Sequence, residues 1–377
     1  MHYLFYFGHP AQYLFLRETI RHLSQSDKHK ITLLIKTKDV LEDLIKHDGL
    51  AYRNILVKKR RNAPIFVILS FLERMLSLLP ILIQKKPDVL VGTDATLALL
   101  GKLLGINRIT IVEDDYNVIR KLADITYPYT QTILCPEVCP VGAWTAKKVG
   151  YKGYMKLGYL HPSLFQPDPS ILAKYGLQKP YVLIRLSSLK AHHDVNIKGI
   201  SPALLRPVIH LIESQGYAVW LSAEFTIRPD LQQYLLQIDP SDMHHVLAQA
   251  LLLLSDSQSM SVEAAMLGVP SLRYSDFAGR ISVLEELEHT YGLTIGLKTG
   301  QETQLITQLT ELLKQAAGRT VFQERRERML QDKVNVTDFL VWFLEEYPYS
   351  AKRMRTDPDY QLRFIEQLPK QNRVQNE

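Results

Sequence analysis

The stretch YLFYFGHPAQYLFLRETIRHL, residues 3–23, decides the fold class. Its first five residues are apolar and predict a buried strand, the next five form a loop that starts at Gly8, and the remainder carries a helical pattern. A second apolar run, ITLLIK at residues 31–36, follows. A strand, a glycine loop, a helix and a strand in this order predict the start of a parallel α/β sheet.

The same alternation recurs along the chain and divides it in two. Apolar runs typical of strands covered on both faces lie at residues 88–92, 108–113 and 132–136, and the alternation restarts at 181–187, 218–224, 251–257 and 270–274. Four prolines interrupt it in HPSLFQPDPSILAKYGLQKP. We predict two doubly wound Rossmann-like α/β domains that face each other across a cleft. Their expected ranges are 1–160 and 181–345, with a linker over 161–180 and a C-terminal helix or tail over 346–377.

Length, charge and cysteine content exclude several classes of protein. A chain of 377 residues is long enough for two cores, and 45 Lys and Arg against 39 Asp and Glu give a net charge of +6, which mildly favours anionic partners. Cys135 and Cys139 lack the CxxC spacing and a second ligand pair, so we expect reduced cysteines of a cytoplasmic protein. The N-terminus lacks the features of a signal peptide. Neither GxGxxG nor GxxxxGK[ST] occurs, which argues against a standard NAD site and a P-loop.

The segment LSDSQSMSVEAA, residues 254–265, points most directly to a ligand. A buried strand ends there in a turn that opens a helix, and Glu263 lies about one helical turn inside. The turn consists of Ser257, Gln258, Ser259 and Met260. Amides and hydroxyls at a helix N-terminus can bind phosphate oxygens, and such a glutamate can accept hydrogen bonds from both ribose hydroxyls. The same pattern also suits a plain helix start, with Ser257 or Ser259 as its cap.

This segment resembles the donor site of GT-B nucleotide-sugar enzymes, especially the non-hydrolysing UDP-N-acetylglucosamine 2-epimerases. Their pattern is close to S-D-S-G-G-x-x-x-E-A followed by L-G-x-P. The matching residues are Ser257, Glu263, Ala264, Leu267, Gly268 and Pro270. The resemblance implies that Ser257 contacts phosphate and Glu263 the ribose, whereas Gln258 and Ser259 stand where that family has glycines.

The chain as a whole resembles the domain-of-unknown-function 354 family still more closely, and that family is similar to the epimerases. The matching stretches are GHPAQYLF, KPDVLVG, GYLHPSLFQPDPSIL with the following IRLSSLKAHHDV, and DMHHVLAQALLLLSDSQSMSVEAAMLGVP. They extend in order from the first strand to about residue 345 and imply the GT-B fold. The family has no established reaction that could be transferred to this chain.

Three residues of the first domain are candidates for acid–base chemistry. Asp94 and Glu113 each follow a predicted strand and are expected at the cleft, where the epimerases hold an aspartate and a glutamate implicated in proton transfer. The match is partial, because the turn here reads G-T-D-A and Asp115 competes with Glu113. His9, in the first loop, could accept a proton from an acceptor hydroxyl. The alternative for each of them is a helix cap or a local hydrogen bond.

The second domain offers cations for the diphosphate of a donor. Arg185, Lys190 and His193 come from the strand and loop after residue 181 and would approach the phosphates from the other side. The alternative is a solvated basic loop. Adjacent side chains of one loop rarely share a metal ion, so we expect no metal and no cofactor apart from the nucleotide sugar itself.

Other basic residues of the second domain are weaker candidates. Arg280 lies ten residues after Pro270, as does a phosphate-side arginine of the epimerases. His244 and His245 begin a helix, where one of them could face the base or a phosphate, or both could be structural. These residues add to the donor-binding side of the expected cleft.

A basic cluster, residues 58–61, precedes an apolar, helix-like run over residues 64–86. Such a surface would suit an anionic membrane that carries a lipid-linked acceptor, and the alternative is a buried helix after a solvated charge run. Glu73, Arg74 and Pro80 interrupt the run, which argues against a membrane span. No recognised nucleic-acid module is present, so no nucleic-acid partner is expected.

These observations predict a cytoplasmic enzyme, peripheral to a membrane, that transfers a sugar from a nucleotide diphosphate to a glycan or lipid-linked acceptor. The first domain would hold the acceptor and the catalytic groups, and the second the donor. A nucleotide-sugar 2-epimerase is the alternative enzyme, with Asp94, Glu113 and His193 as proton-transfer groups. A non-catalytic protein that binds nucleotide sugars is the third interpretation.

Overall fold

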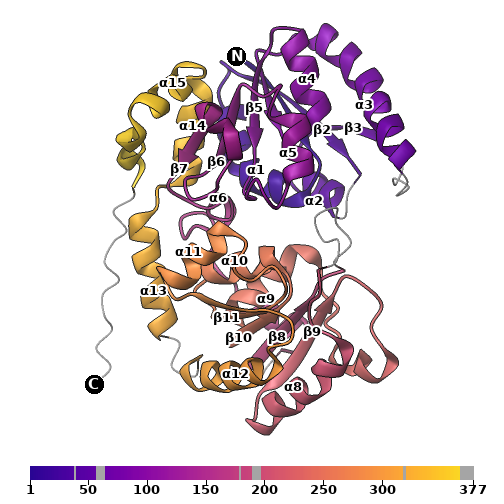
Figure 1. Ribbon diagram of the computed structural model, residues 1–377, viewed down its shortest axis with the longest axis vertical. Coiled ribbons are helices and arrows are strands. Elements are labelled where there is room, and N and C mark those ends of the chain that lie inside the picture. The colour runs from indigo at the N-terminus through magenta and orange to yellow at the C-terminus, as the bar shows by residue number, and fades with distance from the viewer. Residues whose placement is uncertain (38–39, 57–63, 178–179, 189–196, 317–319, 366–377) are drawn as a thin grey trace.

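Two parallel sheets, each covered by helices, make up the protein (Figure 1). The computed structural model describes residues 1–365, apart from 38–39, 57–63, 178–179, 189–196 and 317–319. One sheet has seven strands in the order β3-β2-β1-β4-β5-β6-β7, and the other has five in the order β12-β11-β10-β8-β9. All strand pairs are parallel. The predicted fold class, two doubly wound α/β domains, is confirmed.

The seven-stranded sheet and its helices form what we call the first lobe. Its strands are β1 (His2–Phe7), β2 (Lys30–Lys36), β3 (Arg53–Leu56), β4 (Val89–Gly92), β5 (Asn107–Ile111), β6 (Thr132–Pro136) and β7 (Lys148–Tyr151). Its helices are α1 (Pro10–Ser24), α2 (Leu41–His47), α3 (Pro64–Lys85), α4 (Ala95–Leu103), α5 (Arg120–Thr126) and α6 (Leu157–Leu160). Strand β1 is buried along its whole length. Its odd-numbered side chains, such as Phe5, pack in the core with α1, and Leu4 and Tyr6 pack with α3 and α4 on the other face.

The five-stranded sheet and its helices form the second lobe, reached through the short helix α7 (Ile171–Lys174). Its strands are β8 (Tyr181–Leu186), β9 (Ala218–Ala223), β10 (Leu252–Ser255), β11 (Ser271–Tyr274) and β12 (Thr294–Leu297). Its helices are α8 (Pro202–Ser214), α9 (Met243–Gln249), α10 (Gln258–Met266), α11 (Ser282–His289) and α12 (Glu302–Ala316). Strand β10 is central and fully buried, which places the start of α10 at the middle of the sheet's carboxyl edge.

The last helices carry the chain back to the first lobe, as Figure 1 shows. They are α13 (Thr320–Asp332), α14 (Val336–Glu345) and α15 (Tyr349–Thr356). Helix α14 packs against α1 and α6, and the Tyr3 hydroxyl donates to the carbonyl of Leu344 at 3.0 Å. The structure therefore differs from the expected domain over 181–345, because the apolar face of α14 completes the core of the first lobe. Sequence periodicity shows that a helix has an apolar face, but not which lobe covers it.

The structure also bears on the expected membrane contact. Within the described ranges, no helix combines the length and apolar character needed to cross a membrane. The basic cluster Lys58–Arg61 lies outside the described residues. Helix α3, which follows it, covers one face of the first sheet.

Candidate functional site

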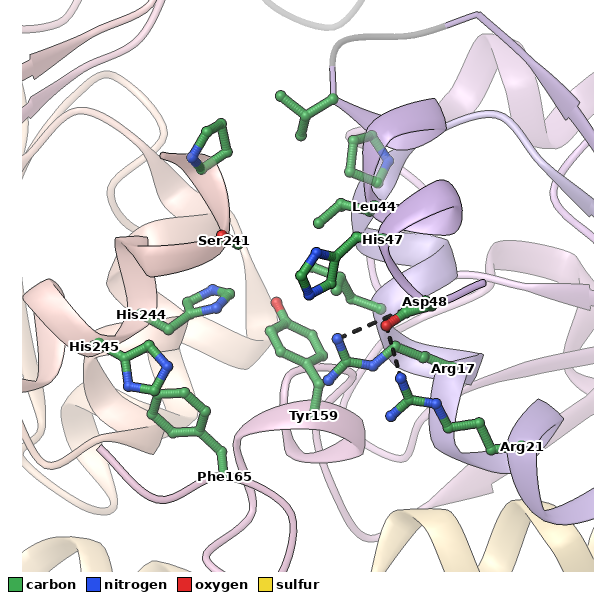
Figure 2. Close-up of a pocket in the computed structure, with 14 residues that line it drawn as sticks. Arg17, Arg21, Leu44, His47, Asp48, Tyr159, Phe165, Ser241, His244 and His245 are labelled. Carbon is green, nitrogen blue, oxygen red and sulfur yellow. Dashed lines mark hydrogen bonds and ion pairs between the residues drawn. The ribbon is translucent and has the colours of Figure 1, made fainter. Parts of the chain in front are cut away.

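A cavity of about 350 Å³ lies between the lobes (Figure 2). The first lobe contributes Pro10, Leu14, Arg17, Arg21, Val40, Leu44, His47 and Asp48, the second contributes Pro240, Ser241, His244 and His245, and Tyr159 and Phe165 lie between. This volume is within the range of small-molecule sites, and such sites commonly form where two domains meet. The cavity has apolar walls and a high content of imidazole and guanidinium groups.

The two arginines of the cavity are tethered to one carboxylate. Arg21 Nη2 lies 2.7 Å from Asp48 Oδ1, and Arg17 Nη1 lies 4.0 Å from Asp48 Oδ2. The Tyr13 hydroxyl also donates to Asp48, and burial together with this bond raises the pKa of Tyr13. Figure 2 shows both arginines turned toward Asp48 and the His47 imidazole turned toward the opposite wall. Asp48 therefore offsets part of the positive charge, and His47 projects from the first lobe.

The second-lobe wall carries two adjacent histidines. His245 Nδ1 accepts from the backbone N–H of Asp168 at 2.9 Å, and its ring lies 4.8 Å from the ring of Phe165. His244 packs on Tyr159, with ring centroids 5.5 Å apart. A hydrogen bond and ring packing thus hold the two imidazoles in place at the edge of the cavity.

Glu263 adjoins the cavity at the seam between the lobes. Its Oε1 accepts from the Tyr159 hydroxyl at 2.7 Å, and its Oε2 lies 3.6 Å from His244 Nε2. Glu263 does not line the cavity, but both of these partners do. Burial opposes ionisation, yet the charges of His244 and Lys156 and the bond from Tyr159 outweigh it and lower the pKa of Glu263. Glu263 is therefore an ionised carboxylate that is 8% exposed.

Lys156 forms an ion pair with Glu113 and is close enough to Glu263 for their charges to interact. Its Nζ lies 2.7 Å from Glu113 Oε2, and the backbone N–H of Met155 donates to Glu113 Oε1 at 2.6 Å. Burial alone would lower the pKa of Lys156, but the charges of Glu113 and Glu263 raise it. Of the two glutamates expected at the cleft from the sequence, Glu113 is thus paired with a buried cation, and Glu263 feels the charge of the same cation. Lys156 was not among the residues expected at the site, because the sequence shows there only a lysine within a largely apolar segment.

Asp94 and His9 form capping contacts at the ends of strands. Asp94 Oδ1 accepts from the backbone N–H groups of Thr96 at 2.8 Å and Leu97 at 3.2 Å, while its Oδ2 lies 3.6 Å from Arg74 Nε on α3. His9 is exposed and accepts from the Ala11 N–H at 3.2 Å through Nδ1. The helix-cap alternative describes these contacts, and neither residue lines the cavity.

Side chains of the hydroxyl-rich turn at the start of α10 bond to the backbone of the turn itself. Ser257 Oγ accepts from the backbone N–H of Met260 at 3.4 Å, and Met260 itself is buried. Gln258 Nε2 donates to the Asp256 carbonyl at 3.1 Å, so this side chain folds back over the turn where the resembled pattern has glycine. Ser259 is half-buried. Because Ser257 caps α10, Glu263 is not needed at the helix start.

The two expected cations of the second lobe that the structure describes, Arg185 and Arg280, lie apart from the cavity. Arg185 donates to Ser222 Oγ at 2.7 Å and to Glu224 Oε1 at 2.5 Å, which ties it to the neighbouring strand β9. Arg280 is exposed beside the ring of Phe277. Lys190 and His193 lie outside the described residues. The structure therefore does not bring Arg185 or Arg280 to the cavity wall.

Asp256 holds both ends of the loop that contains Lys190 and His193. Its Oδ1 accepts from the Ser187 N–H at 2.7 Å, and its Oδ2 accepts from the Ile200 N–H at 3.2 Å. Burial raises the pKa of Asp256 to about 6, although these hydrogen bonds act in the opposite direction. Ser187 and Ile200, which precede and follow residues 189–196, thus both lie next to the turn that opens α10.

Asp115 links the lobes at a second point. Its Oδ2 accepts from both the backbone N–H, at 2.9 Å, and the hydroxyl, at 2.7 Å, of Ser282 at the start of α11. The N-cap residue of α11 is Ile281, which has no capping side chain, so a carboxylate of the other lobe performs this function. Asp115, which competed with Glu113 as an acid–base candidate, contacts the opposite lobe instead.

Metal-binding clusters and disulfide bonds are both absent from the described residues. In the part of the chain that the structure describes, no group of three or more His, Cys, Asp or Glu side chains is arranged to hold a metal ion. Cys135 and Cys139 are buried and not bridged. The chemistry of the cavity therefore has to be argued from its histidines, arginines, tyrosine and adjoining carboxylates.

Solved structures of nucleotide-sugar enzymes share this architecture. The UDP-GlcNAc 2-epimerase from Neisseria meningitidis, bound to UDP-GlcNAc, matches with a TM-score of 0.62 over 92% of this chain and 100% of that chain, at 15% identity. The UDP-GlcNAc 2-epimerase from Methanocaldococcus jannaschii, in complex with UDP-GlcNAc and UDP, gives 0.60 over 83% and 93%, at 16% identity. The calicheamicin glycosyltransferase CalG4 gives 0.55 over 92% and 99%, at 16% identity.

The comparisons establish the fold. The chain has the two-lobed GT-B architecture that UDP-GlcNAc 2-epimerases and glycosyltransferases share. No protein-family model matches the chain, and no curated protein matches it by sequence. Membership of the domain-of-unknown-function 354 family therefore stays a prediction.

Proposed function

We propose that the protein is an enzyme that binds a nucleotide diphosphate sugar between its lobes and transfers the sugar to a glycan or lipid-linked acceptor. The observation that carries this proposal is Glu263, an ionised carboxylate beside the interlobe cavity that its own helix does not use as a cap. The structures from Neisseria meningitidis and Methanocaldococcus jannaschii hold UDP-GlcNAc, which supports a ligand of this class.

The Glu263 carboxylate retains acceptor capacity for a ribose. An ionised carboxylate has about four lone-pair positions, and Tyr159 and His244 use only part of them. A ligand in the cavity would contact Tyr159 and His244 directly and reach Glu263 between them. The diphosphate would then lie beside His244 and His245, which can donate hydrogen bonds to its oxygens.

Sugar transfer requires one base and a stabilised leaving group. His47 projects from the first lobe toward the second (Figure 2), and a neutral imidazole there would take the proton of the acceptor hydroxyl. The acceptor oxygen forms a bond to the sugar carbon C1 while the bond from C1 to the diphosphate oxygen breaks. His244, His245 and Arg17 would stabilise the charge on the departing diphosphate. No cofactor is part of this proposal.

The proposal is tested by the affinity of the protein for UDP. Glu263→Gln should weaken UDP binding about ten- to a hundredfold in titration calorimetry, since hydrogen bonds to a charged group contribute about 1.5 to 3 kcal/mol. Glu288→Gln is a control, because Glu288 is also an ion-paired, largely enclosed glutamate of the second lobe, half-buried and held by Arg273 at 2.6 Å. Equal UDP affinity of wild type and a folded Glu263→Gln variant would contradict the assignment.

A nucleotide-sugar 2-epimerase is the second candidate. Glu113 and Lys156 place two groups capable of proton transfer next to Glu263, and epimerisation by elimination needs two such groups. Incubation with UDP-GlcNAc in the absence of any acceptor, followed by NMR of the configuration at C2, separates the two reactions. Conversion to the manno epimer under these conditions would overturn sugar transfer in favour of epimerisation.

A further inference from the structure

Helix α3 has apolar side chains on two opposite faces. Its inner face buries Leu78, Ile81 and Leu82 against the first sheet. Its outer face exposes Leu69 (51%), Leu72 (49%), Leu76 (75%) and Ile83 (56%). At about 100° per residue, these four positions form one strip on the side of the helix opposite Leu78. A helix that covers a sheet ordinarily presents polar residues to solvent, so the fold does not account for this strip.

The strip continues onto the neighbouring helices. Leu103 and Leu104 are exposed at the end of α4, and Leu122 and Ile125 are exposed on α5. Helix α4 packs against both α3 and α5, which Figure 1 shows on the first lobe. Four residues on α3, two at the end of α4 and two on α5 account for eight of the thirteen large hydrophobic side chains that are exposed among the described residues. We call these eight residues the α3–α5 surface.

Basic residues surround this surface. The exposed basic residues on the three helices and directly after α3 are Lys85, Lys86, Lys102, Arg120 and Lys121. The exposed acidic residues there are Glu73 and Asp124, and Asp124 lies 3.7 Å from Arg120. The described part of the surface therefore has a net positive charge.

We propose that the α3–α5 surface docks the protein on the anionic face of a lipid bilayer. All eight exposed side chains are leucine or isoleucine, which suit hydrocarbon, whereas protein–protein interfaces are enriched in aromatic residues, methionine and arginine. The basic residues complement anionic headgroups. The proposal rests on the described surface alone, independently of the proposed function and of Lys58–Arg61. Docking there would bring a lipid-linked acceptor to the first lobe.

Flotation with lipid vesicles tests this proposal. Wild-type protein should float with vesicles of equal parts phosphatidylcholine and phosphatidylglycerol at low salt, and much less with phosphatidylcholine alone. The double variant Leu72→Gln/Leu76→Gln should bind at least about tenfold more weakly, because two inserted side chains become polar. Val321→Gln/Leu362→Gln, which changes two exposed hydrophobic residues elsewhere, should bind as wild type does. Arg120→Gln/Lys121→Gln should weaken binding only to the anionic vesicles.

Three results would overturn docking on a membrane. The first is absence of wild-type binding to the anionic vesicles at low salt. The second is equal binding by the Leu72→Gln/Leu76→Gln variant and its control. The third is a wild-type protein that binds no vesicles but forms a concentration-dependent dimer in light scattering, when only the Leu72→Gln/Leu76→Gln variant loses that dimer. This result would identify a second copy of the chain as the partner of the surface. UDP affinity, measured on the same variants, reports on the proposed function separately.

Discussion

The carboxylates that follow strands β4 and β10 are used in different ways. After β4, Asp94 is itself the N-cap of α4 and bonds to N–H groups two and three residues further along. After β10, Ser257 is the cap of α10, and the carboxylates on either side of it have distant partners. Asp256 bonds to Ser187, 69 residues earlier, and Glu263 bonds to Tyr159, 104 residues earlier.

This difference shows when a carboxylate at the end of a strand is available to bind a distant segment or a ligand. A carboxylate in the cap position satisfies the N–H groups of its own helix, and its chemistry is local. Where a serine takes that position, a carboxylate nearby can hold a loop, the other lobe or a ligand. Glu113 likewise caps no helix, although no serine caps the helix that follows β5, and it bonds to Met155 and Lys156 at the seam.

The largest effect is expected at the seam. Lys156→Met leaves the half-buried Glu113 without its ion-pair partner and removes a positive charge near the buried Glu263, which should lower the free energy of unfolding by about 3 to 5 kcal/mol. Lys152→Met, in the same segment, removes an exposed ion pair with Asp359 and should change little. Urea unfolding of both variants measures the contrast. Similar losses of unfolding free energy in the two variants would show that Lys156 contributes no more to stability than an exposed ion pair does.

A smaller effect, dependent on pH, is expected at Asp256. Because burial raises its pKa to about 6 in the folded state from an ordinary value of 3.8, ionisation is harder in the folded protein than in the unfolded chain. Its contribution to stability is therefore present at low pH and lost as the pH rises, by about 3 kcal/mol in total and mostly between about pH 4 and 6.

The Asp256→Asn variant isolates this contribution, because asparagine does not titrate. The free energy of unfolding of wild type relative to Asp256→Asn should fall between about pH 4 and 7. Urea unfolding across this range supplies the measurement. A difference that is constant with pH would show that folding does not shift the pKa of Asp256, and one that rises would show that the fold stabilises the ionised carboxylate.

The smallest effect is expected at the local cap. Asp94→Ala removes the hydrogen bonds to Thr96 and Leu97 and the charge opposite Arg74, and should lower stability by about 1 to 2 kcal/mol. Asp94→Ser should restore the part of this loss that comes from the cap, and both variants should bind UDP as wild type does. Thermal unfolding and calorimetry check the two statements. Loss of turnover in Asp94→Ser at unchanged stability would return Asp94 to the catalytic candidates.

Part of the site could be predicted from the sequence. The spacing of Ser257 and Glu263 identified the start of α10 and the carboxylate inside it, and the end of strand β5 identified Glu113. Lys156, Tyr159 and His47 were not found, because each is separated by tens of residues from the groups it faces. Arg185, a basic residue at a strand end that was expected at the phosphates, pairs with Glu224 and does not line the cavity.

The sequence by itself determined the two α/β lobes, because strands buried on both faces appear as continuous apolar runs and helices as patterns that repeat every 3.6 residues, and both are local properties of the chain. The tertiary structure decided which lobe covers α14, how Lys156 joins two glutamates, and that an apolar strip stays on the outer face of α3. These outcomes depend on how separate segments are placed relative to one another. No local periodicity carries that information, because the side chains concerned meet only after both sheets have packed.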